Sequence, residues 1–191
     1  GDPEEHPQKE SYKGSVNTVG IRSCYDEGKR IAETLCFDYE RIHNVQVRIA
    51  RIFNTYGPFM LPDDGRVISN FIVQGLKNEP LTIYGEGLQT RSFCYIDDLI
   101  TGLMKLMDSD YSSPINIGNP EEFSIIELAN LVKNEINPNL QLIKKTLPKD
   151  DPTQRKPMIH LANKEIDWRP TIDLKKGLKL TIKYFEEILD K

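Results

Sequence analysis

The sequence has few cysteines and no long apolar run. Its three cysteines are odd in number and never spaced as Cys-x-x-Cys, which argues against a disulfide framework or a zinc site. Free thiols are typical of a reducing, cytosol-like compartment. No apolar stretch approaches the roughly 20 residues that a membrane-spanning helix needs. Residues 1–10 are polar and acidic, unlike a secretory signal. We therefore expect a cytoplasmic protein.

An excess of positive charge is also absent. The net charge is -4, from 25 basic and 29 acidic residues, so no basic surface suggests nucleic acid as a partner. The three histidines lie far apart in the sequence without ligand spacing, so we predict no metal site. Hydrophobic residues make up 38% and charged residues 28%, the balance of a globular protein. A chain of 191 residues can form one sizeable core or two modest lobes.

A glycine-rich nucleotide-binding fingerprint is missing as well. Such a fingerprint lies between a strand and a helix. Gly85-Glu86-Gly87 is followed by a strand pattern, so a hairpin turn is the expected role. We therefore predict that the chain is the carboxyl half of a larger α/β protein, without its first hundred-odd residues.

What is present is an alternation of helical and strand patterns. Apolar residues recur at three- and four-residue steps from Tyr25 to Ile42, and Asn44 ends this predicted helix. Residues 45–53 then read as a buried strand, followed by a turn at 54–58. This order is half of an α/β unit and places Asn54 at the carboxyl end of a parallel strand, where ligands of open α/β sheets gather.

The remaining chain gives further short elements. Asp97 or Asp98 can cap one helix, Ser124 and Glu127 have capping-box spacing, and Asp173 can cap the last helix. The predicted helices lie at 67–76, 99–107, 124–136 and 174–189. The predicted strands lie at 81–84, 89–96, 115–117 and 140–143, and a polar loop at 146–157.

Tyr25 and Lys29 are the most informative pair. Four residues apart on a helix, they project from one face. An ammonium beside a phenol favours the phenolate, which makes the tyrosine a proton acceptor near neutral pH. A surface helix that carries one aromatic residue and one lysine is the alternative interpretation of this spacing.

With its other motifs, the chain resembles the UDP-glucuronate decarboxylases (UDP-xylose synthases) of the extended short-chain dehydrogenase/reductases, from Gly1 to about Phe185. The Tyr-x-x-x-Lys and Gln-x-Arg-x-Phe patterns place it in the superfamily, and Asp-Asp-Gly-Arg-Val and Arg-Lys-Pro narrow the resemblance to decarboxylases. These motifs lie at 25–30, 51–58, 63–67, 81–85, 89–93, 116–120 and 154–157.

The resemblance implies an α/β fold: the C-terminal part of a Rossmann-type parallel-sheet domain with a small α/β substrate-binding lobe. Residues 1–57 and about 93–107 would belong to the NAD-binding domain, and residues about 58–92 and 108–191 to the nucleotide-sugar-binding domain. The implied cofactor is NAD, the substrate a UDP-sugar, and the full-length protein a homodimer. A Golgi-lumenal parent is then the alternative to a cytoplasmic one.

The resemblance also implies residue roles. Tyr25 would take the proton of the sugar's 4-hydroxyl, Lys29 would assist it and hold the nicotinamide ribose, and Arg155 would bind the reacting carboxylate. The other residues would contact the cofactor or the diphosphate and uracil of the substrate. Cofactor binding is implied for Tyr25, Lys29, Thr55 and Arg66. Substrate binding is implied for Asn54, Ile83, Tyr84, Gly85, Arg91 and Arg155.

Some residues depart from the family pattern. Phe59 stands where the family usually has arginine, Met158 where it has aspartate, and Thr18-Val19 replaces Pro-Ile. Two other readings remain: a UDP-sugar 4-epimerase or nucleotide-sugar dehydratase, and a non-catalytic nucleotide-sugar-binding fragment. Without a dinucleotide cradle, the isolated chain is expected to be inactive.

Overall fold

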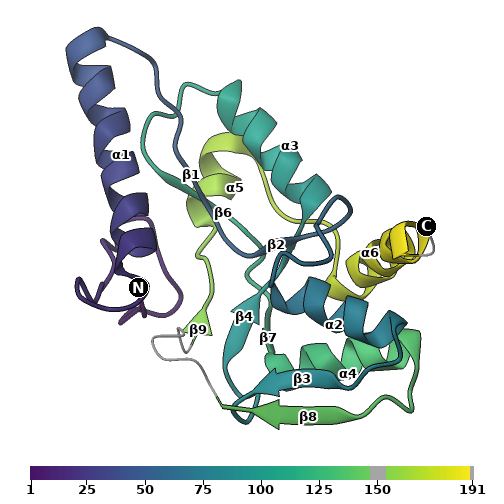
Figure 1. The fold of residues 1–191 in the computed structure, drawn as a ribbon. Helices are drawn as coiled ribbons and strands as arrows, with labels where there is room; N and C mark the ends of the chain where they lie inside the picture. The colour runs from purple at the N-terminus through teal and green to yellow at the C-terminus, as the bar shows by residue number, and fades with distance from the viewer. Residues whose placement is uncertain (147–153, 190–191) are drawn as a thin grey trace.

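The computed structural model describes residues 1–146 and 154–189, and Figure 1 shows the arrangement of their helices and strands. The helices are α1 (Ser23–His43), α2 (Val67–Leu76), α3 (Ile96–Met107), α4 (Ile125–Ile136), α5 (His160–Ile166) and α6 (Leu174–Leu189). The strands are β1 (Ala50–Ile52), β2 (Thr55–Tyr56), β3 (Leu81–Tyr84), β4 (Thr90–Ser92), β5 (Cys94–Tyr95), β6 (Ile115–Ile117), β7 (Glu122–Ser124), β8 (Leu142–Lys145) and β9 (Gln154–Arg155).

Parallel pairing dominates the strands, as expected for an α/β fold. β1 pairs with β6, β2 with β5, and β3 with β8, all in parallel. β4 lies between β7, which is antiparallel to it, and β9, which is parallel. The β1–β6 pair crosses the predicted domain boundary near residue 108. The predicted hairpin at residues 85–87 is wrong, because β3 and β4 pair with other strands instead of with each other.

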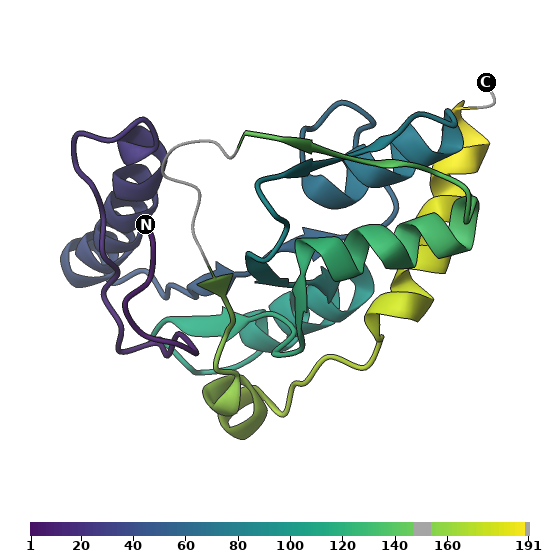
Figure 2. The same ribbon diagram turned by 90° about the horizontal axis from the view of Figure 1, so that it is seen from below.

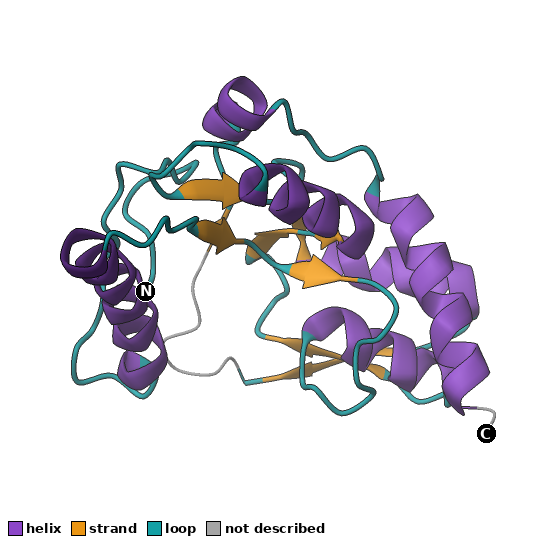
Figure 3. Ribbon diagram, turned by 90° about the horizontal axis from the view of Figure 1, so that it is seen from above, coloured by secondary structure: helices purple, strands orange, loops and turns teal. Residues whose placement is uncertain are grey.

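Two apolar clusters hold these strands in place. The larger one is formed by α2, α4, α6 and β3, with Phe71, Leu128, Leu178 and Phe185 almost fully buried. The smaller one lies around α3, α5 and β6 and includes the buried Trp168. Figures 2 and 3 show the lobe of α2, α4, β3 and β8 at the opposite end of the molecule from α1.

Helix α1 stands apart from both clusters. It contains no buried residue, and Ile31, Leu35, Tyr39 and Ile42 are all about half exposed or more. The prediction of a buried strand at 45–53 is also wrong. β1 has only three residues, and 53% of Ile52 is exposed because, in the described part of the chain, β1 has a strand partner on one edge only.

Most helix boundaries follow the predicted signals. Asn44 ends α1 in the left-handed conformation, and Ser124 and Glu127 form the expected capping box of α4. The predicted cap of α3 is wrong: Tyr95 is its N-cap, and Asp98 lies in the first turn. The predicted strand at 89–96 is divided into β4 and β5. The 147–153 part of the predicted polar loop lies outside the described residues. None of the described helices is long and apolar enough to cross a membrane.

Candidate active site

Two cations lie near the ring of Tyr25 at the start of α1. Lys29 Nζ lies 5.4 Å from the Tyr25 ring centroid, and Arg22 Cζ lies 5.5 Å from it. Both Tyr25 and Lys29 are therefore on one face of the helix, as their spacing predicts. Because 57% of Tyr25 is exposed, the phenol can meet a ligand from solvent.

Two arginines lie on neighbouring strands of the three-stranded sheet. Arg91 of β4 and Arg155 of β9 are direct partners in the parallel register, so both side chains leave the sheet at the same position. Burial lowers the pKa of Arg155, with further contributions from the like charges of Arg91 and Arg22, partly opposed by Asp26 and Tyr25. Residues of α1 thus contribute to the electrostatic environment of Arg155, although β9 follows α1 by more than a hundred positions in the sequence.

Arg22 and Asp26 were not predicted as site residues. Both line a cavity of about 230 Å³ together with residues from the N-terminal segment. The Arg22 Nε is buried without a hydrogen-bond partner among the described residues. A signal for Arg22 was available, because residue i−3 of Tyr25 shares its face when the helix is extended by one turn.

Asn54 and Thr55 follow the carboxyl end of parallel strand β1. The Asn54 carbonyl accepts a hydrogen bond from the Cys94 amide at 2.8 Å, and Thr55 Oγ1 donates to the Phe53 carbonyl at 3.0 Å. Gly57 is required in this turn, since its φ is +151° and a Cβ would lie 2.4 Å from Ile96 Cγ2. Close backbone packing therefore holds Asn54 and Thr55 beyond the carboxyl end of β1, where ligands of open α/β sheets gather, and their contacts with a diphosphate or cofactor stay a prediction.

The remaining predicted residues lie apart from Tyr25, in the lobe of α2 and β3 (Figure 1). Arg66 precedes α2 and pairs with Asp64 at 3.4 Å. Ile83 is 1% exposed, packs within the larger core and lies opposite Lys144 in the β3–β8 pair. Tyr84 is 42% exposed, and the Gly85 amide donates to the Lys145 carbonyl at 2.8 Å.

The donor set suits organic anions better than a metal. In residues 1–146 and 154–189, His, Cys, Asp and Glu side chains form no group of three or more that could hold a metal ion. The exposed Tyr25–Lys29 face offers donors that suit the nicotinamide ribose of NAD, and Thr55 Oγ1, whose hydrogen goes to the Phe53 carbonyl, offers an acceptor. The paired guanidinium groups of Arg91 and Arg155 suit phosphate and carboxylate oxygens.

Known proteins with similar sequences are decarboxylases of a nucleotide sugar. UDP-glucuronic acid decarboxylase 5 of Arabidopsis thaliana is 58% identical over 180 residues, which is 94% of this chain and 53% of that protein. UDP-glucuronic acid decarboxylase 1 of Xenopus tropicalis is 51% identical over 190 residues, which is 100% of this chain and 45% of that protein. The chain thus spans about half the length of the curated relatives it matches.

Solved structures agree on the fold. UDP-glucuronic acid 4-epimerase from Bacillus cereus, in complex with UDP-glucuronic acid and NAD, superposes with a TM-score of 0.82 at 28% identity, covering 98% of this chain and 60% of that one. UDP-N-acetylglucosamine 4-epimerase from Methanobrevibacter ruminantium has a TM-score of 0.91 at 23% identity, with the same coverage.

Residues 1–118 match the NAD dependent epimerase/dehydratase family. This match holds Tyr25, Lys29, Asn54 and Arg91, and it covers more than half of the sequence. The chain therefore belongs to the NAD dependent epimerase/dehydratase family.

Proposed function

We propose that the full-length protein decarboxylates UDP-glucuronate to UDP-xylose with NAD as a recycled cofactor. The observation that carries this proposal is the register of Arg91 beside Arg155, with Tyr25 among the residues that affect the pKa of Arg155. A substrate with a diphosphate and a carboxylate presents anionic groups for these guanidiniums and a hydroxyl for the phenol. Relatives at 51–58% identity that carry the decarboxylase name support the same reaction.

The residues of this chain would divide the work as follows. Tyr25 accepts the proton of the sugar's 4-hydroxyl, and Lys29 stabilises the phenolate. Arg91 holds phosphate oxygens and Arg155 holds the carboxylate. Tyr25 and Lys29 would hold NAD, which would supply hydride transfer at C4 in both directions. The oxidised sugar is a β-keto acid, so its carboxylate leaves as carbon dioxide while the electron pair passes into the 4-ketone. C5 then takes a proton from solvent water, and Tyr25 returns to O4 the proton that it accepted from it.

A matched pair of tyrosine variants of the full-length protein tests this assignment. We expect Tyr25→Phe to lower UDP-xylose formation by at least about 10²-fold, because the proton acceptor is lost, with UDP affinity unchanged. Tyr39→Phe alters another exposed tyrosine of α1 and is expected to leave the rate unchanged. Chromatography separates UDP-xylose from an epimerised uronate, and trapped carbon dioxide gives the rate. Equal rates in both variants, or a product that retains its carboxylate, would reject the proposal.

The isolated 191-residue chain is proposed to be inactive, since its described residues contain no glycine-rich strand–turn–helix. Carbon dioxide release from UDP-glucuronate by this chain alone would contradict that expectation.

We also propose a homodimeric, cytoplasmic full-length protein that uses no metal. The exposed apolar side chains of α1 support self-association, since contiguous apolar surface often marks an interface. Sedimentation equilibrium of the full-length protein measures whether it is a dimer. Activity that survives treatment with a chelator would agree with a reaction that needs no metal. Fractionation of cells tests the cytoplasmic location.

A further inference from the structure

Arg155 stands on a strand that is too short to fix it. β9 contains only Gln154 and Arg155, and its ladder partners on β4 are Thr90 and Arg91. The register also brings two like charges together, and Arg22 adds a third. Repulsion among guanidiniums disfavours their close approach, so contacts that hold the segment after Arg155 favour the observed register.

Gln8 supplies such contacts to the residues directly after Arg155. Gln8 is 8% exposed. Its side-chain Oε1 accepts a hydrogen bond from the backbone amide of Lys156 at 2.8 Å. The backbone amide of Gln8 donates to the Lys156 carbonyl, also at 2.8 Å. Its carbonyl accepts from the Met158 amide, also at 2.8 Å. Both sides of Pro157 are thereby bound to one residue of the N-terminal segment.

Asn116 connects this arrangement to strand β6. Asn116 is 2% exposed, and its Nδ2 donates to the carbonyls of Gln8 and Met158, each at 3.1 Å. The Asn116 amide donates to Glu10 Oε1 at 3.0 Å. Buried amides with satisfied hydrogen bonds specify one arrangement, because any displacement leaves a donor or acceptor unpaired.

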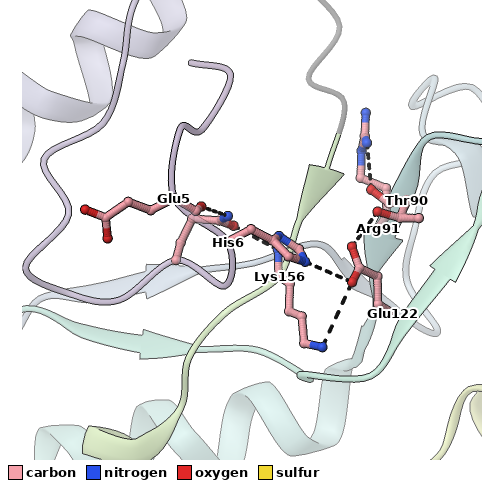
Figure 4. Close-up of polar contacts among 7 residues, drawn as sticks. Glu5, His6, Thr90, Arg91, Glu122 and Lys156 are labelled. Carbon is pink, nitrogen blue, oxygen red and sulfur yellow. Dashed lines mark hydrogen bonds and ion pairs between the residues drawn. The ribbon is translucent and has the colours of Figure 1, made fainter.

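A second anchor holds the same N-terminal segment against the other side of β4. His6 Nε2 lies 3.1 Å from Glu122 Oε2, and Lys156 Nζ lies 4.0 Å from the same oxygen. Thr90 Oγ1 donates to the other oxygen of Glu122. Figure 4 shows His6, Lys156 and Thr90 directed at Glu122, with Arg91 beside Thr90.

We propose that Gln8, supported by Asn116, is a positioning residue that holds Arg155 beside Arg91 for recognition of the substrate's carboxylate. Gln8 itself touches no reacting atom and acts through the 156–158 backbone. The unusual Met158 is compatible with this role, since its backbone groups make the contacts and its side chain is partly exposed. This inference rests on the proposed function for the identity of the carboxylate ligand.

The test compares Gln8→Ala with Gln141→Ala, an exposed glutamine on the far lobe, in the full-length protein. Hydrogen exchange at the amides of Lys156 and Met158 reads the geometry without any substrate. Calorimetry then measures the affinities for UDP-glucuronate, which has the carboxylate, and UDP-xylose, which lacks it. Gln8→Ala is expected to raise exchange at both amides and to weaken UDP-glucuronate binding by about 10-fold or more, with UDP-xylose changed less than about 2-fold. Gln141→Ala is expected to change none of these values.

A double-mutant cycle decides whether Gln8 acts through Arg155. In an Arg155→Ala background the Gln8 substitution should have almost no further effect on UDP-glucuronate affinity, whereas a general loss of folding would weaken both ligands and add to the first effect. His6→Ala, a surface change, should give a smaller loss of the same selectivity if Gln8→Ala fails to fold. Unchanged exchange, equal loss for both ligands, or full additivity would overturn the proposal. Failure of the proposed function appears separately, as absence of UDP-xylose formation by the wild-type protein.

Discussion

Asp98 shows how a single buried carboxylate can connect distant parts of this chain. It is 5% exposed and accepts hydrogen bonds from the amides of Thr171 and Ile172 and from the Thr171 hydroxyl, at 2.8 to 3.0 Å. Its carbonyl also accepts from the Trp168 indole at 2.9 Å. These contacts fasten the segment that leads into α6 onto the first turn of α3.

Replacing Asp98 should therefore lower the free energy of unfolding more than replacing Asp97. Asp98→Ala removes the buried carboxylate that accepts three hydrogen bonds from Thr171 and Ile172, so we expect a loss of about 2–4 kcal/mol in the free energy of unfolding of the 191-residue chain. Asp97→Ala, at an exposed position of the same turn, should change it by less than about 0.5 kcal/mol. Urea titration measures both, and similar midpoints for the two variants would show that Asp98 is not a structural connection.

At the scale of residues, short-range spacing was predictable and long-range contact was not. The four-residue step from Tyr25 to Lys29 places both on one face whatever surrounds the helix. The bonds among Gln8, Asn116 and Met158 join positions up to 150 apart and leave no local pattern. For the same reason Asp98 was interpreted as a helix cap, since its partners near residue 171 could not be anticipated.

The helices illustrate the scale of elements, and α4 has the clearest local determinant. Ser124 Oγ accepts from the Glu127 amide at 3.2 Å, and the Glu127 carboxylate accepts from the Ser124 hydroxyl and amide at 2.7 and 2.8 Å. The hydrogen bond from the Ser124 side chain, followed by that from its backbone, lowers the pKa of Glu127 below its ordinary 4.5. This carboxylate therefore stabilises the folded state above pH 4.5, and the contribution disappears as the pH falls through the folded-state pKa.

The capping box gives a pH-dependent prediction. Ser124→Ala should lower the free energy of unfolding by about 1 kcal/mol at pH 7, and the difference from wild type should shrink as Glu127 becomes protonated below pH 4.5. Ser112→Ala, at an exposed loop position, serves as the control and should be neutral at every pH. Denaturant titrations from pH 3 to 7 measure the difference; a constant deficit across this range would contradict the role of the carboxylate.

Elements were predicted well where the local sequence of a segment determines its secondary structure. Apolar periodicity and caps define α1, α2, α4 and α6 locally, so their bounds agree with the pattern to within a few residues. Strand partners depend on the whole fold. Residues 81–84 and 90–92 have the sequence pattern of a hairpin. In the structure β3 pairs with β8 and β4 pairs with β9, an arrangement that goes with the buried layer of α2 and α4.

At the scale of the whole molecule, α1 is attached to the rest by polar contacts and not by a core. The Arg51 Nε and Nη2 donate to the two carboxylate oxygens of Glu33 at 3.0 and 2.7 Å, and its Nη1 donates to the Glu10 carbonyl at 2.7 Å. This half-buried, bidentate pair connects β1, α1 and the N-terminal segment.

Loss of that connection should loosen α1 selectively. A hydrogen-bonded charged pair of this kind is worth about 1.5–3 kcal/mol, so Arg51→Ala should speed amide exchange of residues 28–40 by about 10- to 100-fold. Arg41→Ala removes an exposed pair with Asp38 within the same helix and should have little effect. Exchange followed by peptide mass spectrometry compares the two, and equal protection in both would show that α1 is held by something other than Arg51.

Because α1 is exposed, turnover of the full-length protein should be sensitive to low concentrations of urea. Tyr25 lies on α1, which contains no buried residue, whereas Arg155 lies on β9, which is paired with β4. The position of Tyr25 relative to Arg155, the two residues proposed to act on the 4-hydroxyl and the carboxylate, should then depend on what packs on the apolar side of α1 in the full-length protein. Turnover should accordingly decline at urea concentrations at which the fluorescence of Trp168 still reports an intact cluster around α3, α5 and β6.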